Sequence, residues 1–217
     1  ILSKLLEENE DKNLNEKQIE FSSIIQKSGN DLIGLINDIL DLAKVESGKM
    51  EAEIRVCSLS LLRKNIEMVF SAIALDRKVN FKITVDEKLP EQVLTDEVKL
   101  EQILKNLLSN AFKFTDANGN VCVLFRKINN TDSNASQHDE LEISVKDSGI
   151  GIPPEKQSLV FMAFQQADGS TKRKYGGTGL GLSISKEMAK LLGGDIYLKS
   201  KVGEGTEFSL RIPLNVY

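Results

Sequence analysis

The sequence predicts an α/β two-layer sandwich that is preceded by a long helix of a helical hairpin. Residues 21–48 carry apolar side chains at helical spacing, whereas three later segments alternate apolar and polar residues as strands do. Helical segments lie between those strands, and such intermixing is typical of a sheet with helices packed on it. The pattern changes between Gly48 and Ile54, so we expect one domain at residues 1–50 and another at 54–217.

The predicted N-terminal helix has a wide apolar stripe. Its side chains recur every three or four residues, interrupted at Ser28: Phe21, Ile25, Leu32, Leu35, Ile39 and Leu42, flanked by Ile33, Ile36, Leu40 and Ala43. Gly48 is a natural residue to end this helix. Residues 1–8, ILSKLLEE, are expected to form the other arm of the hairpin. The remaining apolar surface favours a homodimeric four-helix bundle over packing within one chain.

The second part is expected to contain strands at residues 79–85, 141–146 and 207–212. Helices are expected at about 60–75, at 97–113 behind a Thr95 or Asp96 cap, and at 180–192. Residues 127–140 are polar and are expected to form a hairpin loop.

The composition excludes several classes of function. The 217 residues are 41% hydrophobic with a net charge of -4, which gives no argument for a nucleic-acid partner. No apolar run reaches membrane-spanning length, so we expect no membrane segment in this fragment, although the full-length protein could be membrane-anchored. Two cysteines, Cys57 and Cys122, predict a reducing, cytoplasmic location. The single histidine, His138, lies in the polar loop, which argues against zinc or triad chemistry.

Residues 174–185, KYGGTGLGLSIS, place four glycines in six positions before a helical pattern. Exposed backbone N–H groups at a helix N-terminus are typical of an anion site. No Gly-Lys-Ser/Thr follows, and the spacing is not the dinucleotide fingerprint. Taken alone, this segment fits a nucleotide site and a flexible loop equally well.

Three other segments add chemistry. In NLLSNAFKFT, Asn106 and Asn110 share a helical face with Lys113, and amides with an ammonium group suit a metal-phosphate. In DSGIGIP, Asp147 ends a strand, where a buried carboxylate would accept an exocyclic amine and select adenine over guanine. The segment FMAFQQ then precedes a polar loop with the basic residues Lys172, Arg173 and Lys174.

In this order the segments resemble the sensor histidine kinases over nearly the whole chain. DEVKLEQILKNLLSNAFKFT resembles the N box of that family, DSGIGIP its first glycine box, FMAFQQ its F box and GGTGLGL its second glycine box. SKVGEGTEF resembles the final glycine-containing segment. The implied fold is the histidine kinase, gyrase and chaperone type of ATP-binding fold. Upstream, NDILDLAKVESGKM resembles the second helix of the dimerisation and phosphotransfer hairpin in hybrid kinases.

The resemblance implies ATP and Mg²⁺ as ligands and assigns roles to residues. Asn110 would carry Mg²⁺, Asp147 would accept from the adenine amino group, and Arg173 and Tyr175 would close over the nucleotide in a lid. The implied ATP-binding residues are Asn106, Asn110, Lys113, Phe114, Asp147, Gly149, Gly151, Ile152, Arg173, Tyr175, Gly177, Thr178, Gly179, Leu180, Gly181 and Thr206.

The function implied is histidine autophosphorylation from Mg-ATP in two-component signalling, with a response regulator receiver domain as partner. The family's acceptor histidine is expected a little upstream of Ile1, so this fragment is not expected to phosphorylate itself. An ATP-hydrolysing conformational machine would need a glutamate base where Asn106 stands. An ATP-binding regulatory module and a mitochondrial-type protein-serine kinase remain open, although the helical stalk favours the histidine kinase.

Overall fold

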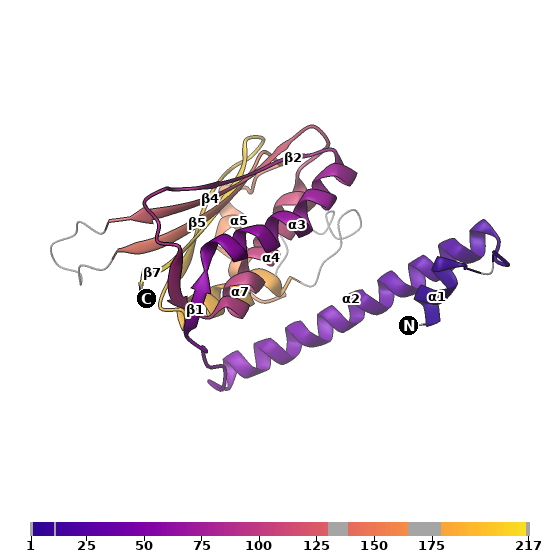
Figure 1. Cartoon of the computed structure of the whole chain (residues 1–217), viewed down its shortest axis with the longest axis horizontal. Helices are drawn as coiled ribbons and strands as arrows, with labels where there is room; N and C mark the ends of the chain where they lie inside the picture. Colours follow the sequence, from indigo (N-terminus) through magenta and orange to yellow (C-terminus); the bar gives the residue numbers. More distant parts are fainter. Residues whose placement is uncertain (1, 11, 130–138, 165–178, 216–217) are drawn as a thin grey trace.

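The computed structural model describes residues 2–10, 12–129, 139–164 and 179–215, which form a helical arm and an α/β domain (Figure 1). In the arm, α1 (Leu2–Glu8) lies beside the first half of α2 (Glu16–Glu46), as the predicted hairpin requires. Asn15 caps α2, since its side chain accepts from the Gln18 N–H at 3.0 Å while Gln18 Oε1 accepts from the Asn15 N–H at 2.9 Å. The helix ends before Gly48, which adopts a φ of 64°.

The α/β domain has two layers. One layer is a five-stranded sheet in the order β2-β4-β5-β7-β6, in which β2 and β4 are parallel and all other neighbours are antiparallel. Its strands are β2 (Asn80–Val85), β4 (Asn120–Ile128), β5 (Glu140–Asp147), β6 (Asp195–Lys201) and β7 (Gly205–Pro213). The other layer contains α3 (Leu59–Arg77), α4 (Glu97–Phe114) and α7 (Gly181–Leu191), with the short α5 (Pro154–Gln157) and η1 (Leu159–Phe161) nearby. The predicted two-layer sandwich is confirmed.

A single core joins the two layers. The inward-facing residues of β5, Leu141, Ile143 and Val145, are at most 1% exposed and lie under α4. Phe112 of α4 stacks on Phe70 of α3, with 5.6 Å between ring centroids. Each large apolar side chain buried in this way stabilises the fold by roughly 1.5–3 kcal/mol. The core therefore fixes the position of α4 over the sheet.

The structure adds strands that the periodicity analysis did not predict. These are β4, β6 and a separate two-stranded antiparallel sheet of β1 (Arg55–Ser58) and β3 (Gln92–Thr95). The structure also decides which residue caps α4. Asp96 does so, because its Oδ1 accepts from the Lys99 N–H at 3.0 Å, while Oδ2 accepts from the Glu53 N–H at 2.9 Å.

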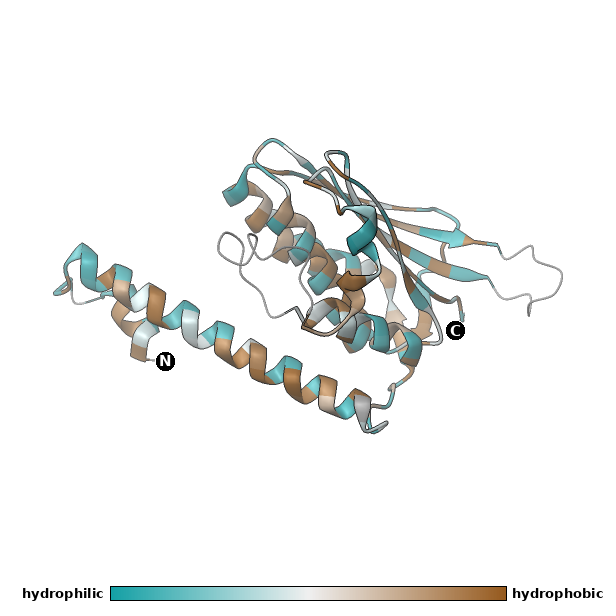
Figure 2. Ribbon diagram, turned by 180° about the vertical axis from the view of Figure 1, so that it is seen from behind, coloured by the Kyte–Doolittle hydropathy of each residue, from teal (hydrophilic) through white to brown (hydrophobic). Residues whose placement is uncertain are grey.

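The apolar stripe of α2 is divided between two faces. Leu35 and Leu42 pack against the core of the α/β domain, and Asp41 Oδ2 accepts from Gln102 Nε2 at 3.0 Å. The other face is exposed, and hydrophobic residues, coloured brown, recur along α2 in Figure 2. Its large side chains include Ile25, Ile33, Ile36, Ile39 and Leu40. The stripe is wider than the α/β domain can cover, so most of it remains open. No helix among the described residues is both long and apolar enough to cross a membrane.

Candidate functional site

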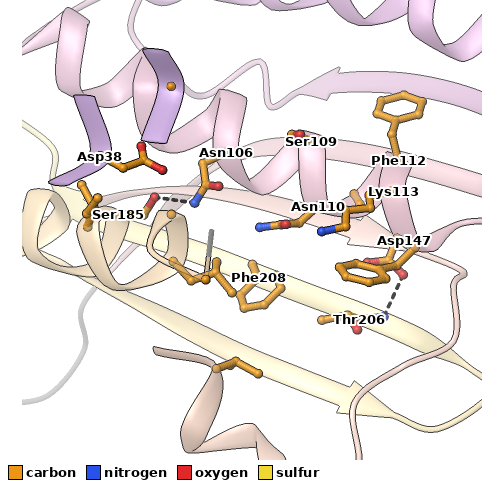
Figure 3. A pocket seen from close by; sticks show the side chains of 18 of the residues that line it. Asp38, Asn106, Ser109, Asn110, Phe112, Lys113, Asp147, Ser185, Thr206 and Phe208 are labelled. Atoms are coloured by element: carbon orange, nitrogen blue, oxygen red, sulfur yellow. Dashed lines mark hydrogen bonds between the residues drawn. The ribbon is translucent and has the colours of Figure 1, made fainter. Parts of the chain in front are cut away.

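A pocket of about 1140 Å³ lies between α4, the start of α7, the ends of β5 and β7, and the facing side of α2 (Figure 3). Ten of the residues that the resemblance assigned to nucleotide binding line it: Asn106, Asn110, Lys113, Phe114, Asp147, Gly151, Ile152, Gly179, Gly181 and Thr206. Gly149 and Leu180 do not line it, and Leu180 is fully buried. Arg173, Tyr175, Gly177 and Thr178 lie outside the described residues.

Asp147 forms one end of the pocket. It is the last residue of β5 and only 7% exposed. Its Oδ1 accepts from the backbone N–H groups of Gly149 at 2.8 Å and Thr206 at 3.3 Å. Burial raises the pKa of the Asp147 carboxyl, against the lowering effect of these two hydrogen bonds. Since Oδ2 has no hydrogen bond with the described residues, it can accept an N–H group from a ligand.

The glycines after Asp147 allow close contacts within the protein. A Cβ on Gly149 would lie 2.3 Å from the carbonyl oxygen of Phe114, at the end of α4. Gly151 has a φ of 70°, and a Cβ there would lie 2.1 Å from the carbonyl oxygen of Lys201. These two glycines therefore let the loop pack against α4 and β6.

One face of α4 forms the middle of the pocket. Asn106, Asn110 and Lys113 all point into it from this face (Figure 3). Asn106 Nδ2 donates to the hydroxyl of Ser185 on α7 at 2.8 Å, whereas Asn110 makes no hydrogen bond with the described residues. Lys113 Nζ lies 5.0 Å from the ring centroid of Phe114, and burial lowers the pKa of this ammonium group. An anion in the pocket would offset that burial cost.

The first turn of α7 forms the other end of the pocket. Gly179 has a φ of 72°, and its carbonyl oxygen accepts from the Phe164 N–H at 3.1 Å. Helix α7 then begins at Gly181 without a side-chain cap and without an acidic residue in its first turn. Its N–H groups and the positive end of its dipole are therefore available to an anion.

Several lining residues were missed by the sequence reasoning: Asp38, Ser109, Ile150, Ser185 and Phe208. Phe208 is on an inward-facing position of β7, 6.1 Å from the ring of Phe161, so the strand alternation did mark it as buried. Ser185 belongs to the quoted glycine segment but carries no local signal of its partner. Asp38 comes from α2, and nothing in the sequence indicates that α2 reaches this pocket.

A metal ion in this pocket would need a bound ligand to help hold it. Within the described ranges, no group of three or more His, Cys, Asp or Glu side chains is arranged around a metal position. Asn110 offers one amide oxygen, and Mg²⁺ in proteins is commonly held by few side chains together with phosphate oxygens. The pocket has a carboxylate acceptor at one end, and an amide, an ammonium group and a helix N-terminus toward the other. This arrangement suits a molecule with an amine-bearing ring and a polyphosphate.

The comparisons with known proteins agree with this geometry. Residues 95–216 match the family model described as histidine kinase-, DNA gyrase B- and HSP90-like ATPase. That match covers more than half of the chain and contains α4, β5, α7 and β7, which form most of the pocket. The fold and the site thus define an ATPase-type nucleotide-binding domain.

Relatives that match nearly the whole chain show to which proteins within this family it is similar. Hybrid signal transduction histidine kinase B of Dictyostelium discoideum is 40% identical over 203 residues, which is 94% of this chain and 10% of that protein. Signal transduction histidine-protein kinase BarA of Escherichia coli strain K12 is 35% identical over 92% of this chain and 21% of that protein. The chain belongs to the sensor histidine kinases.

A solved structure gives the same result for the fold. The crystal structure of full-length ShkA in complex with AMPPNP superposes with a TM-score of 0.78 and 29% sequence identity. The alignment covers 100% of this chain and 42% of ShkA. The chain therefore spans less than half of ShkA and about a tenth to a fifth of the two curated relatives.

Proposed function

We propose that the chain binds Mg-ATP and supplies the γ-phosphoryl group for histidine autophosphorylation in two-component signalling. The observation that carries the proposal is Asp147, whose buried carboxylate is held through Oδ1 and leaves Oδ2 for the amino group of adenine. Guanine has a carbonyl oxygen at that position, which a carboxylate would repel. The relative ShkA was crystallised with AMPPNP, an ATP analogue, which supports the same ligand class here.

The other lining residues have proposed roles that depend on which part of the nucleotide they would meet. Asn110 would hold Mg²⁺, which would offset the charge of the phosphates when bound. Lys113, the amide of Asn106 and the first turn of α7 would meet the phosphates, with Phe114, Ile152 and Thr206 near the nucleoside. The same proposal assigns Arg173, Tyr175, Gly177 and Thr178 to a lid and phosphate loop, and Leu180 to the start of α7.

Asn106 disfavours the ATP-hydrolysing alternative. A hydrolase needs a group that removes a proton from water, and an amide cannot do so. Asn106 also donates a hydrogen bond to Ser185, which fixes its place in the wall. Glu101 pairs instead with Lys105 at 3.2 Å on an outer turn of α4 and does not line the pocket. Phosphoryl transfer to a separate acceptor therefore fits the pocket better than hydrolysis.

We also propose a homodimer formed through residues 1–50, with residues 54–217 as the catalytic domain. On α2, Ile33, Ile36 and Leu40 are 59%, 49% and 53% exposed, and burying each against a second copy would contribute roughly 1.5–3 kcal/mol. Ile36→Asp should yield a monomer in sedimentation while the ATP affinity stays unchanged. A dimer that survives this change would place the interface elsewhere.

A response regulator receiver domain is the proposed recipient of the phosphoryl group. Both cysteines are free thiols, with Cys57 buried and Cys122 exposed, which supports a cytoplasmic location for this part of the protein.

The test is incubation with γ-labelled ATP. The 217-residue chain has only His138, in the polar loop outside the described residues, so it should take no acid-labile label. A longer version that includes the family histidine should take the label and pass it to an aspartate of a receiver domain. Label on the shorter chain that is lost in His138→Ala would contradict this division of roles. A longer version that binds ATP but takes no label would favour the regulatory module.

A further inference from the structure

Gly181 is a glycine for a reason other than backbone conformation. It is the first residue of α7, and it does not have the positive φ that Gly179 has. A Cβ on Gly181 would lie 2.3 Å from Oδ1 of Asn106 and 2.9 Å from its Cγ. The missing side chain therefore makes room for the amide of Asn106, which comes from α4.

Ser185 holds the other end of the same amide. It lies one helical turn after Gly181, on the same face of α7, and is 3% exposed. Its hydroxyl accepts from Asn106 Nδ2 at 2.8 Å (Figure 3). The oxygen of the Asn106 amide is thus packed against Gly181 while its nitrogen is bonded to Ser185.

We propose that Ser185 is a positioning residue that orients the Asn106 amide toward the phosphates of ATP. A primary amide has two N–H groups in one plane. When Ser185 accepts one of them and Gly181 confines the oxygen, rotation of the amide is restricted, and the second N–H is held for a ligand in the pocket that Asn106 lines. Ser185 itself acts only through Asn106. This inference rests on the proposed ATP site and adds a residue to it.

The arrangement also ties α4 to the glycine segment. Asn106 and Ser185 are 79 residues apart in the sequence, and their hydrogen bond joins α4 to α7, whose first turn is the proposed phosphate site. An amide that is positioned before the ligand arrives loses less entropy on binding than a freely rotating one. The expected benefit is therefore to phosphate binding and not to adenine binding.

The test compares Ser185→Ala with a matched control, Ser209→Ala. Ser209 is on β7, is also buried at 8% exposure, and its hydroxyl shares a hydrogen bond of 3.0 Å with that of Ser144, but it does not line the pocket. Calorimetry should show Mg-ATP affinity lower by roughly three- to tenfold in Ser185→Ala, with affinity for adenosine unchanged. Ser209→Ala should bind Mg-ATP as the wild type does.

A double-mutant cycle with Asn106→Ala separates positioning from a structural role. In the Asn106→Ala background, Ser185→Ala should cause no further loss of Mg-ATP affinity. Gly181→Ala, which forces the Asn106 amide to move, should reproduce the Ser185→Ala phenotype by another route. Wild-type affinity in Ser185→Ala, or an equal loss with and without Asn106, would overturn the inference. A wild type that binds no ATP would instead refute the proposed function itself.

Discussion

At the Asp147 end of the pocket, the contacts that hold the lining residues in place come mostly from backbone groups. At the Asn110 end, they come from side chains. Asp147 is held by the N–H groups of Gly149 and Thr206, and a Cβ on Gly205 would lie 2.0 Å from its carbonyl oxygen. At the other end, Asn106 is held by a hydroxyl, and Asn110 has no hydrogen bond with the described residues. The Asp147 end is thus part of the fold, while the Asn110 end can change without disturbing it.

This difference predicts that substitutions at the two ends will act on different properties. At the Asp147 end, replacing the glycines that pack against backbone should lower the stability of the fold, and ligand affinity will fall with it. At the Asn110 end they should lower ligand affinity at nearly constant stability. The predictions below test this separation.

The largest expected effect is that of Gly149→Ala on stability. The new Cβ would meet the backbone of Phe114 at 2.3 Å, and a backbone atom cannot move away as a side-chain tip can. We expect a loss of roughly 2–3 kcal/mol in the free energy of unfolding and a Tm lower by roughly 5–10 °C. Thermal unfolding of Gly181→Ala is the matched comparison. There the three atoms nearest to the new Cβ all belong to the side chain of Asn106, which can move, so Tm should stay within roughly 3 °C of the wild type. Equal losses of Tm in the two variants would remove the distinction between the ends.

The next effect is that of Asn110→Ala on the magnesium dependence of binding. If Asn110 holds Mg²⁺, ATP should bind to the wild type at least about tenfold more tightly with Mg²⁺ than with EDTA, and to Asn110→Ala almost equally in both. Titration calorimetry in the two buffers measures this, with thermal unfolding as a control for stability. A variant that keeps the full effect of Mg²⁺ would remove Asn110 from the metal site.

The smallest effect concerns pH and the stability of the ligand-free protein. Burial raises the pKa of Asp147, so its ionised form disfavours folding at neutral pH, and this cost disappears as the carboxyl is protonated at lower pH. Asp147→Asn removes the charge and keeps an oxygen for Gly149 and Thr206. It should raise Tm by roughly 1–3 °C at pH 7, and the difference should shrink as the pH falls into the range where carboxyl groups titrate. A Tm difference that grows on acidification would show that the charge stabilises the fold.

The sequence predicted most of the fold because most helices and strands have apolar residues at the spacing typical of their own secondary structure. The helices at 97–113 and 180–192 and the strands at 79–85, 141–146 and 207–212 all occur close to the expected positions. Strand β4 has a comparable alternation in Val121, Val123 and Phe125, so the same pattern would have predicted it. The four-residue strands β1 and β3 are too short to show a periodic pattern, and they form only because residues 55–58 pair with residues 92–95.

The site was predictable where a role depends on one segment and not where it depends on two. Asp147 follows a strand, so its place at the end of the sheet could be foreseen. The partner of Asn106 could not, because Ser185 becomes its neighbour only through the packing of α4 on α7. The stripe of α2 likewise predicted a helix with a partner, but not that the α/β domain would cover Leu35 and Leu42 and leave Ile36 and Leu40 exposed.

The most direct test of the ATP site is a calorimetric titration of the wild type and of Asp147→Asn with Mg-ATP, and of the wild type with Mg-GTP. We predict that the wild type binds Mg-ATP and binds Mg-GTP at least about tenfold more weakly. Asp147→Asn should lose roughly 1–3 kcal/mol of the binding free energy for Mg-ATP, because an amide N–H can face the adenine amine without an acceptor. Equal affinity of the wild type for both nucleotides, or unchanged ATP affinity in Asp147→Asn, would contradict the assignment of Asp147 to adenine.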